Sequence, residues 1–356
     1  MAGSISDAPA TGARAFMSQR RISRQQGFRI ERIQAERIAR AEKRAAKAED
    51  LLAGGALGDE QRGRIIAHYG VQVAVEALEG EQTGQRFRCH RRANLEQLVT
   101  GDEVVWQPAA EAGTGVISAL LPRRSVLVRP DPYGKLKPVA ANIDRILLVI
   151  APEPTPSAEL IDRYLIACEA TGIRPVLVLN KADLMTADRA VALGELMAGF
   201  AALGYETRTL SAHGDTGDLR ALVAGLTVVF VGQSGVGKSS LVNALLPDVA
   251  QKVHALSSGS KLGQHTTTTA CWFDLPEGGA LIDSPGIREF GVWHMDREQL
   301  LDGFIEFRPW LGQCRFRNCA HRQEPGCALR LAVDEGHIQP RRLASFQRLA
   351  EEQETR

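Results

Sequence analysis

Hydrophobic and polar positions follow two different rhythms along this chain. Between residues 63 and 128, short runs such as 71–76 and 102–106 alternate hydrophobic and polar residues, and glycine-containing turns separate them. Alternation with a period of two indicates strands that bury one face. Five such runs within about 65 residues therefore predict a small β-barrel of the OB type.

From residue 143 the pattern changes to continuous apolar runs that alternate with helical spacing. The runs 143–151 and 174–179 are apolar almost throughout, and 157–169 between them has the spacing of a helix. Strands that are buried on both faces and separated by helices are typical of a twisted parallel sheet with helices on both sides. The segment before them, 125–142, contains three prolines and is expected to be a linker.

The clearest chemical motif follows the apolar run 227–231. The pattern G-x-x-x-x-G-K-[ST] begins at Gly232, and a helix-like stretch comes after it. Glycines let successive N–H groups converge on phosphate oxygens, while the lysine serves the β- and γ-phosphates and the serine binds Mg²⁺. This strand–turn–helix context argues against a chance glycine-rich turn. The predicted phosphate-binding residues are Gly232, Gln233, Ser234, Gly235, Val236, Gly237, Lys238, Ser239 and Ser240.

A second motif, upstream, predicts which base is bound. The run 174–179 ends in Asn180, Lys181, Ala182 and Asp183. An aspartate at the carboxyl end of a parallel strand can accept hydrogen bonds from the ring N–H and the exocyclic amine of guanine, and adenine lacks this donor pair. Ser211 and Ala212 end another strand-like run, where a backbone N–H can meet the guanine carbonyl. These residues predict guanine binding and disfavour an ATPase.

A third motif lies downstream of the phosphate loop. Asp283 and Gly286 form D-x-x-G after a short apolar strand. Asp283, together with Ser239, is the predicted Mg²⁺ partner, and the Gly286 amide is expected to contact the γ-phosphate. The stretch 263–269 between these motifs ends in four threonines, Thr266 to Thr269, one of which should complete the Mg²⁺ shell.

The order of these motifs is shifted relative to common GTPases, because the guanine motifs precede the phosphate loop. Such a circular permutation is tolerated where domain termini lie close together. This order, with 263–269 and the flanking segments, closely resembles the bacterial RsgA (YjeQ) family of small-subunit biogenesis GTPases over about residues 20–350. The resemblance implies GTP hydrolysis, late maturation of the small ribosomal subunit, rRNA binding through the barrel and C-terminal domain, and release after hydrolysis. The alternative is a nucleotide-gated RNA-binding module, or a GTPase that acts on a different RNA.

The residue that would orient the attacking water is not a glutamine here, because Ile287 follows Gly286. His265 is the candidate catalytic residue, since histidine is suited to positioning water or moving a proton. The resemblance includes both this histidine and the apolar replacement. The alternatives are that His265 only packs or binds a partner, or that RNA or a partner supplies the catalytic group.

The C-terminal region carries a metal-binding pattern. Its four candidate ligands are Cys314, Cys319, His321 and Cys327. Three thiolates and one imidazole within 14 residues match a structural, four-coordinate Zn²⁺ site, the alternative being free or disulfide-bonded cysteines. Amphipathic helices are predicted at 296–310 and 329–350, and Arg341, Arg342 and Arg348 are expected to form a solvated face.

Composition changes this picture in three ways. At 356 residues and 44% hydrophobic content the chain suits two or three domains, and a net charge of +1 means that RNA affinity must come from local patches. Residues 1–50 hold eleven basic and six acidic residues, a net charge of +5. This segment is expected to be either a solvated helix or an arm that orders on RNA, and the resemblance favours the arm. No apolar run approaches membrane-spanning length, and neither a signal peptide nor a secreted disulfide framework is evident.

We therefore predict a multidomain, cytoplasmic monomer that does not contact a membrane. Its expected cofactors are one structural Zn²⁺ and Mg²⁺ with GTP, and its expected partners are GTP, GDP and the small ribosomal subunit with its rRNA. The predicted domains are a basic arm (1–60), an OB-type barrel (61–128), a circularly permuted α/β GTPase domain (140–292) and an α-helical zinc-knuckle domain (293–356).

Overall fold

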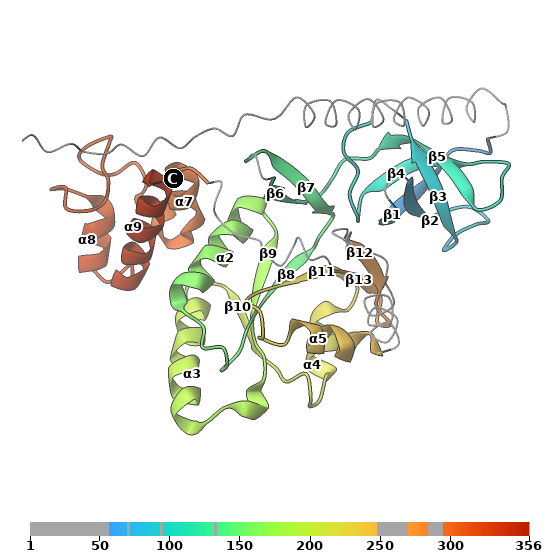
Figure 1. Ribbon diagram of the computed structural model, residues 1–356. Helices are drawn as coiled ribbons and strands as arrows, with labels where there is room; N and C mark the ends of the chain where they lie inside the picture. Colours follow the sequence, from blue (N-terminus) through green and yellow to red (C-terminus); the bar gives the residue numbers. More distant parts are fainter. Residues whose placement is uncertain are drawn as a thin grey trace, which may run out of the picture. The chain divides into compact units, whose positions relative to one another are not determined.

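The computed structural model describes most of the chain (Figure 1). The described residues are 57–69, 72–92, 95–131, 134–247, 270–283 and 295–355. The chain divides into two compact units, Met1–Asp50 and Leu51–Arg356, and every described residue belongs to the second unit. The arm predicted for 1–60 therefore lies almost entirely outside the described residues.

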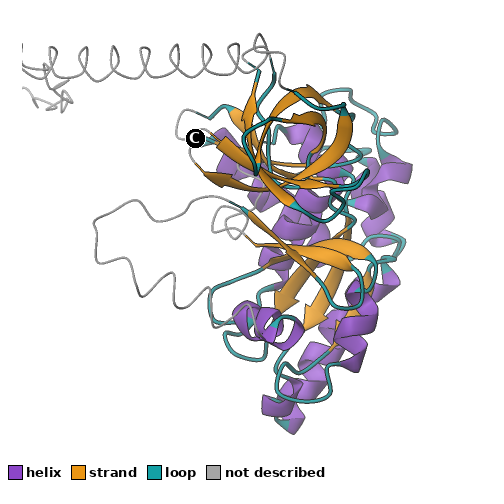
Figure 2. Cartoon of the chain, turned by 90° about the vertical axis from the view of Figure 1, so that its right-hand side faces the viewer, coloured by secondary structure: helices purple, strands orange, loops and turns teal. Residues whose placement is uncertain are grey.

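The first part of the second unit is the predicted barrel, whose strands curl around one another in Figure 2. It is closed in the order β1-β2-β3-β5-β4. Its strands are β1 (Gln61–Tyr69), β2 (Gln72–Ala77), β3 (Arg86–Arg91), β4 (Glu103–Pro108) and β5 (Thr114–Leu120). The period-two pattern holds in β3, where Phe87 and Cys89 are buried between exposed arginines. Trp106 fills the interior so tightly that a Cβ on Gly63 would lie 2.6 Å from its Cδ1 atom.

The segment predicted as a linker, 125–142, instead forms an antiparallel hairpin of β6 (Val126–Pro130) and β7 (Leu136–Ala141). This segment still links the barrel to the GTPase sheet, but its two strands were not predicted. Pro130 ends β6, and Pro138 pairs with Val128 where the register shifts, so both lie at positions that a two-stranded ribbon tolerates.

The second part is a six-stranded sheet in the order β10-β9-β8-β11-β13-β12. Its strands are β8 (Arg145–Ile150), β9 (Arg174–Leu179), β10 (Glu206–Thr209), β11 (Leu226–Val231), β12 (Cys271–Asp274) and β13 (Gly279–Asp283). All neighbours are parallel except β12, which pairs with β13 in the antiparallel sense. The carboxyl ends of five strands therefore share one edge of the sheet, and β12 begins at that same edge.

Helices cover both faces of this sheet, as predicted. They are α2 (Ala158–Thr171), α3 (Ala187–Ala202), α4 (Gly217–Val223) and α5 (Lys238–Leu245). Alternate residues of β8 belong to two separate cores: Ile146 and Leu148 pack with α2 and α3, whereas Leu147 and Val149 pack with α4 and α5. Since β8 is buried on both faces, its sequence is continuously apolar.

The C-terminal region has shorter helices than the sequence predicted. They are α7 (Arg297–Gly303), the 3₁₀ helix η3 (Ile305–Trp310), α8 (Ala328–Asp334) and α9 (Pro340–Glu354). Gly336, with φ +80°, separates α8 from α9. Phe304, Phe307 and Phe346 lie in the same buried cluster as α2 and α3, and a Cβ on Gly303 would lie 2.4 Å from Ile166. The C-terminal helices therefore share a continuous core with one face of the GTPase sheet.

The expected solvated face of α9 was wrong for one of its three arginines. Arg341 and Arg348 are partly exposed, but Arg342 is completely buried. Its guanidinium donates to Asp162 of α2 (2.5 Å) and to Glu306 of η3 (2.5 Å), and it lies 4.4 Å from the ring centre of Phe304. Two carboxylates and an aromatic face replace the water that the sequence led us to expect.

Candidate GTP-binding site and metal centre

The predicted phosphate loop joins the end of β11 to the start of α5. Gly232, Gly235 and Gly237 have φ angles of 135°, 84° and 93°, which side chains rarely adopt. At two of these glycines, neighbouring atoms also leave no room for a side chain. A Cβ on Gly232 would lie 2.2 Å from the Val149 carbonyl oxygen, and one on Gly237 would lie 2.3 Å from Asn180 Nδ2. The glycines therefore allow the loop to curl tightly against β8 and the guanine motif.

The cationic residue of the loop lies at the first position of α5. Lys238 Nζ donates to the carbonyl oxygens of Gly232 (2.7 Å) and Gln233 (2.5 Å). Ser239 follows with an exposed side chain in the first helical turn. A lysine, a hydroxyl and a helix N-terminus that meet at one loop suit triphosphate and Mg²⁺ binding.

The guanine motif contacts the phosphate loop directly. Asn180 is buried at the end of β9, where its Nδ2 donates to the Val236 carbonyl (3.0 Å) and its Oδ1 accepts from the Ala212 N–H (3.2 Å). Lys181, with φ +60°, donates through Nζ to the Gly235 carbonyl (2.7 Å). Asn180 therefore connects the guanine motif to the phosphate loop and to the segment of Ser211 and Ala212.

Asp183 is held ready to accept hydrogen bonds. It lies in the short 3₁₀ helix η1 (Ala182–Leu184), and the Ser211 hydroxyl donates to its Oδ1 at 2.5 Å. This hydrogen bond is the main reason why the pKa of Asp183 lies below its usual value, so the carboxylate stays ionised as an acceptor for guanine. Only backbone donors were predicted near Ser211, although a hydroxyl residue at the end of the neighbouring strand was a signal for this second contact.

Asp283 is the last residue of β13, at the same sheet edge as the ends of β9, β10 and β11. It pairs in register with Cys271 of the antiparallel strand β12. Gly286, His265 and the threonines 266–269 lie outside the described residues. Their roles stay predictions.

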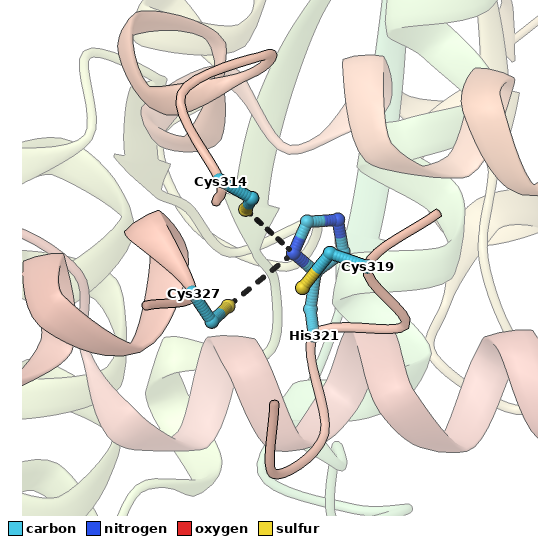
Figure 3. A group of neighbouring side chains, drawn as sticks. All are labelled: Cys314, Cys319, His321 and Cys327. Atoms are coloured by element: carbon cyan, nitrogen blue, oxygen red, sulfur yellow. Dashed lines mark hydrogen bonds between the residues drawn. The ribbon is translucent and has the colours of Figure 1, made fainter. Parts of the chain in front are cut away.

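The four predicted metal ligands come together in the C-terminal region (Figure 3). Their ligand atoms all lie within 4.8 Å of one another. His321 Nδ1 is 3.5 Å from Cys314 Sγ and 3.4 Å from Cys327 Sγ, close to the roughly 3.6 Å expected between sulfur and nitrogen in a tetrahedral Zn²⁺ site. All six cysteines of the chain are free thiols, which argues against the disulfide alternative.

The surrounding helices hold these ligands in place. The Ala328 N–H at the start of α8 donates to Cys314 Sγ (3.3 Å), and Gln347 of α9 donates to the His321 carbonyl (2.5 Å). Burial lowers the pKa of His321, which favours the neutral imidazole that binds a metal. Burial, with the neighbouring thiols, raises the pKa of Cys319 to about 12, so its thiolate needs a bound cation here. The donor set and its geometry therefore fit Zn²⁺.

These features define the class of protein: a circularly permuted P-loop GTPase with an OB-type barrel before it and a Cys₃His cluster after it. The sequence model of the RsgA GTPase family matches residues 120–293. The small ribosomal subunit biogenesis GTPase RsgA of Azotobacter vinelandii is 58% identical over 335 residues, which cover 94% of this chain and 97% of that protein. The chain therefore belongs to the RsgA GTPase family, and it is a GTPase.

Solved structures confirm the predicted fold class. YjeQ from Thermotoga maritima aligns with a TM-score of 0.68 at 31% identity, over 84% of this chain and 100% of that chain. YloQ, described as a circularly permuted GTPase, aligns with a TM-score of 0.66 at 27% identity, over 83% of this chain and 96% of that one. Within the described ranges, no helix combines the length and apolar character needed to cross a membrane.

Proposed function

We propose that this GTPase is an assembly factor for the small ribosomal subunit, and that it acts on the maturing subunit in the cytoplasm as a monomer. The observation that carries the proposal is the shifted order of guanine and phosphate motifs on one sheet edge, between a barrel and a Cys₃His cluster. The family and the name of its Azotobacter member, a small ribosomal subunit biogenesis GTPase, support the same assignment.

In this proposal each described residue of the sheet edge has a role in binding GTP. Asp183 selects guanine, with Asn180 and Lys181 bracing the loop, and Lys238 binds the β- and γ-phosphates. Ser239 and Asp283 would hold the Mg²⁺ that accompanies the nucleotide, and the ion would supply charge neutralisation at the phosphates. The roles of Gly286 at the γ-phosphate and of His265 in positioning the attacking water belong to the same proposal.

RNA contact is proposed for two basic surfaces. On the barrel, the exposed side chains of Arg86, Arg88 and Arg91 project from β3, and the Arg88 guanidinium lies 5.8 Å from the ring centre of Tyr69. Tyr69 is 58% exposed, and an exposed aromatic ring beside an arginine suits base stacking. Near the zinc ligands, Arg315 lies over the exposed ring of Phe316. GTP hydrolysis is proposed to release the protein from this RNA.

GTP turnover with and without purified small ribosomal subunits tests the proposal. We expect slow basal turnover that small subunits raise at least tenfold, while large subunits, the matched control, have no effect. A Lys238→Ala variant should lose activity under all conditions, because the phosphates lose their cation. ATP should not replace GTP.

Two other outcomes would redirect the assignment. Turnover that small subunits leave unchanged would favour the alternative of a GTPase that acts on a different RNA. Equal hydrolysis of ATP would contradict the guanine role of Asp183.

A further inference from the structure

The barrel contacts the GTPase sheet at β12, the strand next to Asp283. Thr100, in the loop before β4, donates through its hydroxyl to the Ala270 carbonyl at 2.8 Å. Both residues are buried, with exposed fractions of 0% and 5%. A buried hydrogen bond of this kind holds its acceptor in place, because no water replaces the donor if it is lost and the carbonyl is then left unsatisfied.

The loop that carries Thr100 is itself tightly held. The Thr100 carbonyl accepts from the Ala141 N–H (3.0 Å), and Asn142 Nδ2 donates to the Gly101 carbonyl (2.8 Å). Gly101 has φ +92°, and a Cβ there would lie 2.1 Å from the Ala141 carbonyl oxygen and 3.2 Å from Ile282 of β13. The loop therefore meets both strands of the β12–β13 pair.

The barrel also contacts the other end of β12. The Arg64 guanidinium of β1 lies 4.4 Å from the ring centre of Trp272. Trp272 Nε1 donates to Asp274 (2.8 Å), and Arg86 of β3 forms an ion pair with the same carboxylate (3.0 Å). Barrel side chains therefore contact β12 at its beginning, middle and end.

The register of the sheet connects this contact to the nucleotide site. Cys271 pairs directly with Asp283, and Ala270, the acceptor of the Thr100 hydrogen bond, immediately precedes Cys271. One peptide unit and one antiparallel residue pair thus connect the Ala270 carbonyl to the backbone of Asp283.

We propose that Thr100 is a positioning residue for GTP hydrolysis, acting from the barrel through Ala270 and the Cys271–Asp283 pair on the carboxylate of Asp283. This inference rests on the magnesium role proposed above for Asp283. Coupled binding equilibria are reciprocal. A ligand on the barrel that displaces this loop changes the affinity of the site for Mg²⁺ and GTP by some factor. Binding of Mg²⁺ and GTP then changes the affinity of the barrel for that ligand by the same factor.

The test measures GTP turnover by the full-length protein as a function of Mg²⁺ concentration. Thr100→Val keeps the side-chain shape and removes the donor. We expect it to raise the Mg²⁺ concentration for half-maximal turnover about fivefold, a typical coupling between sites. GDP binding without Mg²⁺ should change less than twofold, because the guanine motif is untouched. Thr100→Ser should restore the wild-type Mg²⁺ dependence.

Thr114→Val is the matched control, because Thr114 also donates to a backbone carbonyl, that of Glu111 (2.7 Å), in an exposed turn of the barrel. It should leave the Mg²⁺ dependence unchanged. A second pair of variants keeps the inference testable if Thr100→Val fails to fold. Arg64→Gln should shift the Mg²⁺ dependence in the same direction as Thr100→Val. Arg62→Gln, on the same strand, should leave it unchanged. Equal Mg²⁺ dependence in the Thr100→Val and Thr114→Val proteins would overturn the inference.

Asp283→Asn separates this inference from the proposed function on which it rests. If that variant needs more Mg²⁺ and Thr100→Val does not, only the positioning role of Thr100 fails. If Asp283→Asn itself has normal Mg²⁺ dependence, the magnesium role of Asp283 fails and the positioning role falls with it.

Discussion

The two regions that flank the GTPase sheet are attached to it by different chemistry. The C-terminal helices are joined through Arg342, whose guanidinium is completely buried between Asp162 and Glu306. The barrel is joined at β12, where the side chains of Arg86 and Asp274 are 56% and 51% exposed. One ion pair is buried and the other is open to solvent, although the barrel also contributes a buried hydrogen bond from Thr100 and the buried side chains of Ile66 and Ala74, which share a cluster with Trp272.

The difference indicates which neighbour can move. Removing one partner of a buried ion pair strands an uncompensated charge, so the C-terminal contact tolerates little displacement. An exposed ion pair contributes little and is screened by salt, so the Arg86–Asp274 pair opposes displacement of the barrel much less. The adjustable contact is the one that touches the strand beside Asp283.

The largest expected effect is on the metal centre, which lies among the C-terminal helices. Cys327→Ser should abolish stoichiometric zinc binding, and α8 should lose its protection from hydrogen exchange while the barrel strands keep theirs. Structural Zn²⁺ contributes roughly 10–16 kcal/mol of apparent binding free energy, so a three-ligand site should not hold the fold. Zinc analysis and hydrogen exchange measure both effects.

Cys168→Ala is the control for this experiment, because Cys168 is a buried thiol outside the ligand group. It should keep one zinc per chain. Full zinc content in the Cys327→Ser protein would contradict the four-ligand assignment.

The next effect tests the buried ion pair. Arg342→Ala should lower the free energy of unfolding by about 3–5 kcal/mol, because Asp162 and Glu306 remain buried without their cation. Urea unfolding provides the measurement. Arg348→Ala is the matched control on the same helix: its side chain is 58% exposed and pairs with Glu159, so the cost should stay below about 1 kcal/mol. Equal losses in the two variants would remove the contrast between the attachments.

A smaller effect is expected at the exposed pair of the barrel. A double-mutant cycle on Arg86→Gln and Asp274→Asn should give a coupling of about 0.2–1 kcal/mol in thermal unfolding, and this coupling should vanish at about 1 M salt. A salt-insensitive coupling of about 3 kcal/mol would show that the barrel is attached as firmly as the C-terminal helices.

The smallest effect concerns Glu76, which lies near the same contact. Burial, followed by the nearby carboxylate of Asp274, raises the pKa of Glu76 above its usual value. A carboxyl group whose pKa is raised by folding contributes its full stability below its unfolded pKa and loses it as the pH rises through the folded pKa. Glu76→Gln should therefore raise the unfolding midpoint by about 1 °C at pH 7 and by nothing below about pH 4. An effect that is constant with pH would contradict this origin.

Local patterns determined much of this protein. The barrel strands, the sheet strands, the phosphate loop and the ligand spacing of the Cys₃His cluster could be predicted because each depends on residues close together in the sequence. The shared edge of β9, β10, β11 and β13 also followed, since carboxyl ends of parallel strands must meet.

The tertiary structure decided which surfaces are covered. An arginine on an amphipathic helix has the same local pattern whether water or carboxylates face it, so the burial of Arg342 depended on Asp162 and Glu306, which are far away in the sequence. The Ser211–Asp183 hydrogen bond and the contact of Thr100 with Ala270 were hidden for the same reason. Each of these contacts joins two segments that the packing of whole elements brings together. The hydrophobic pattern within either segment alone does not predict such a contact.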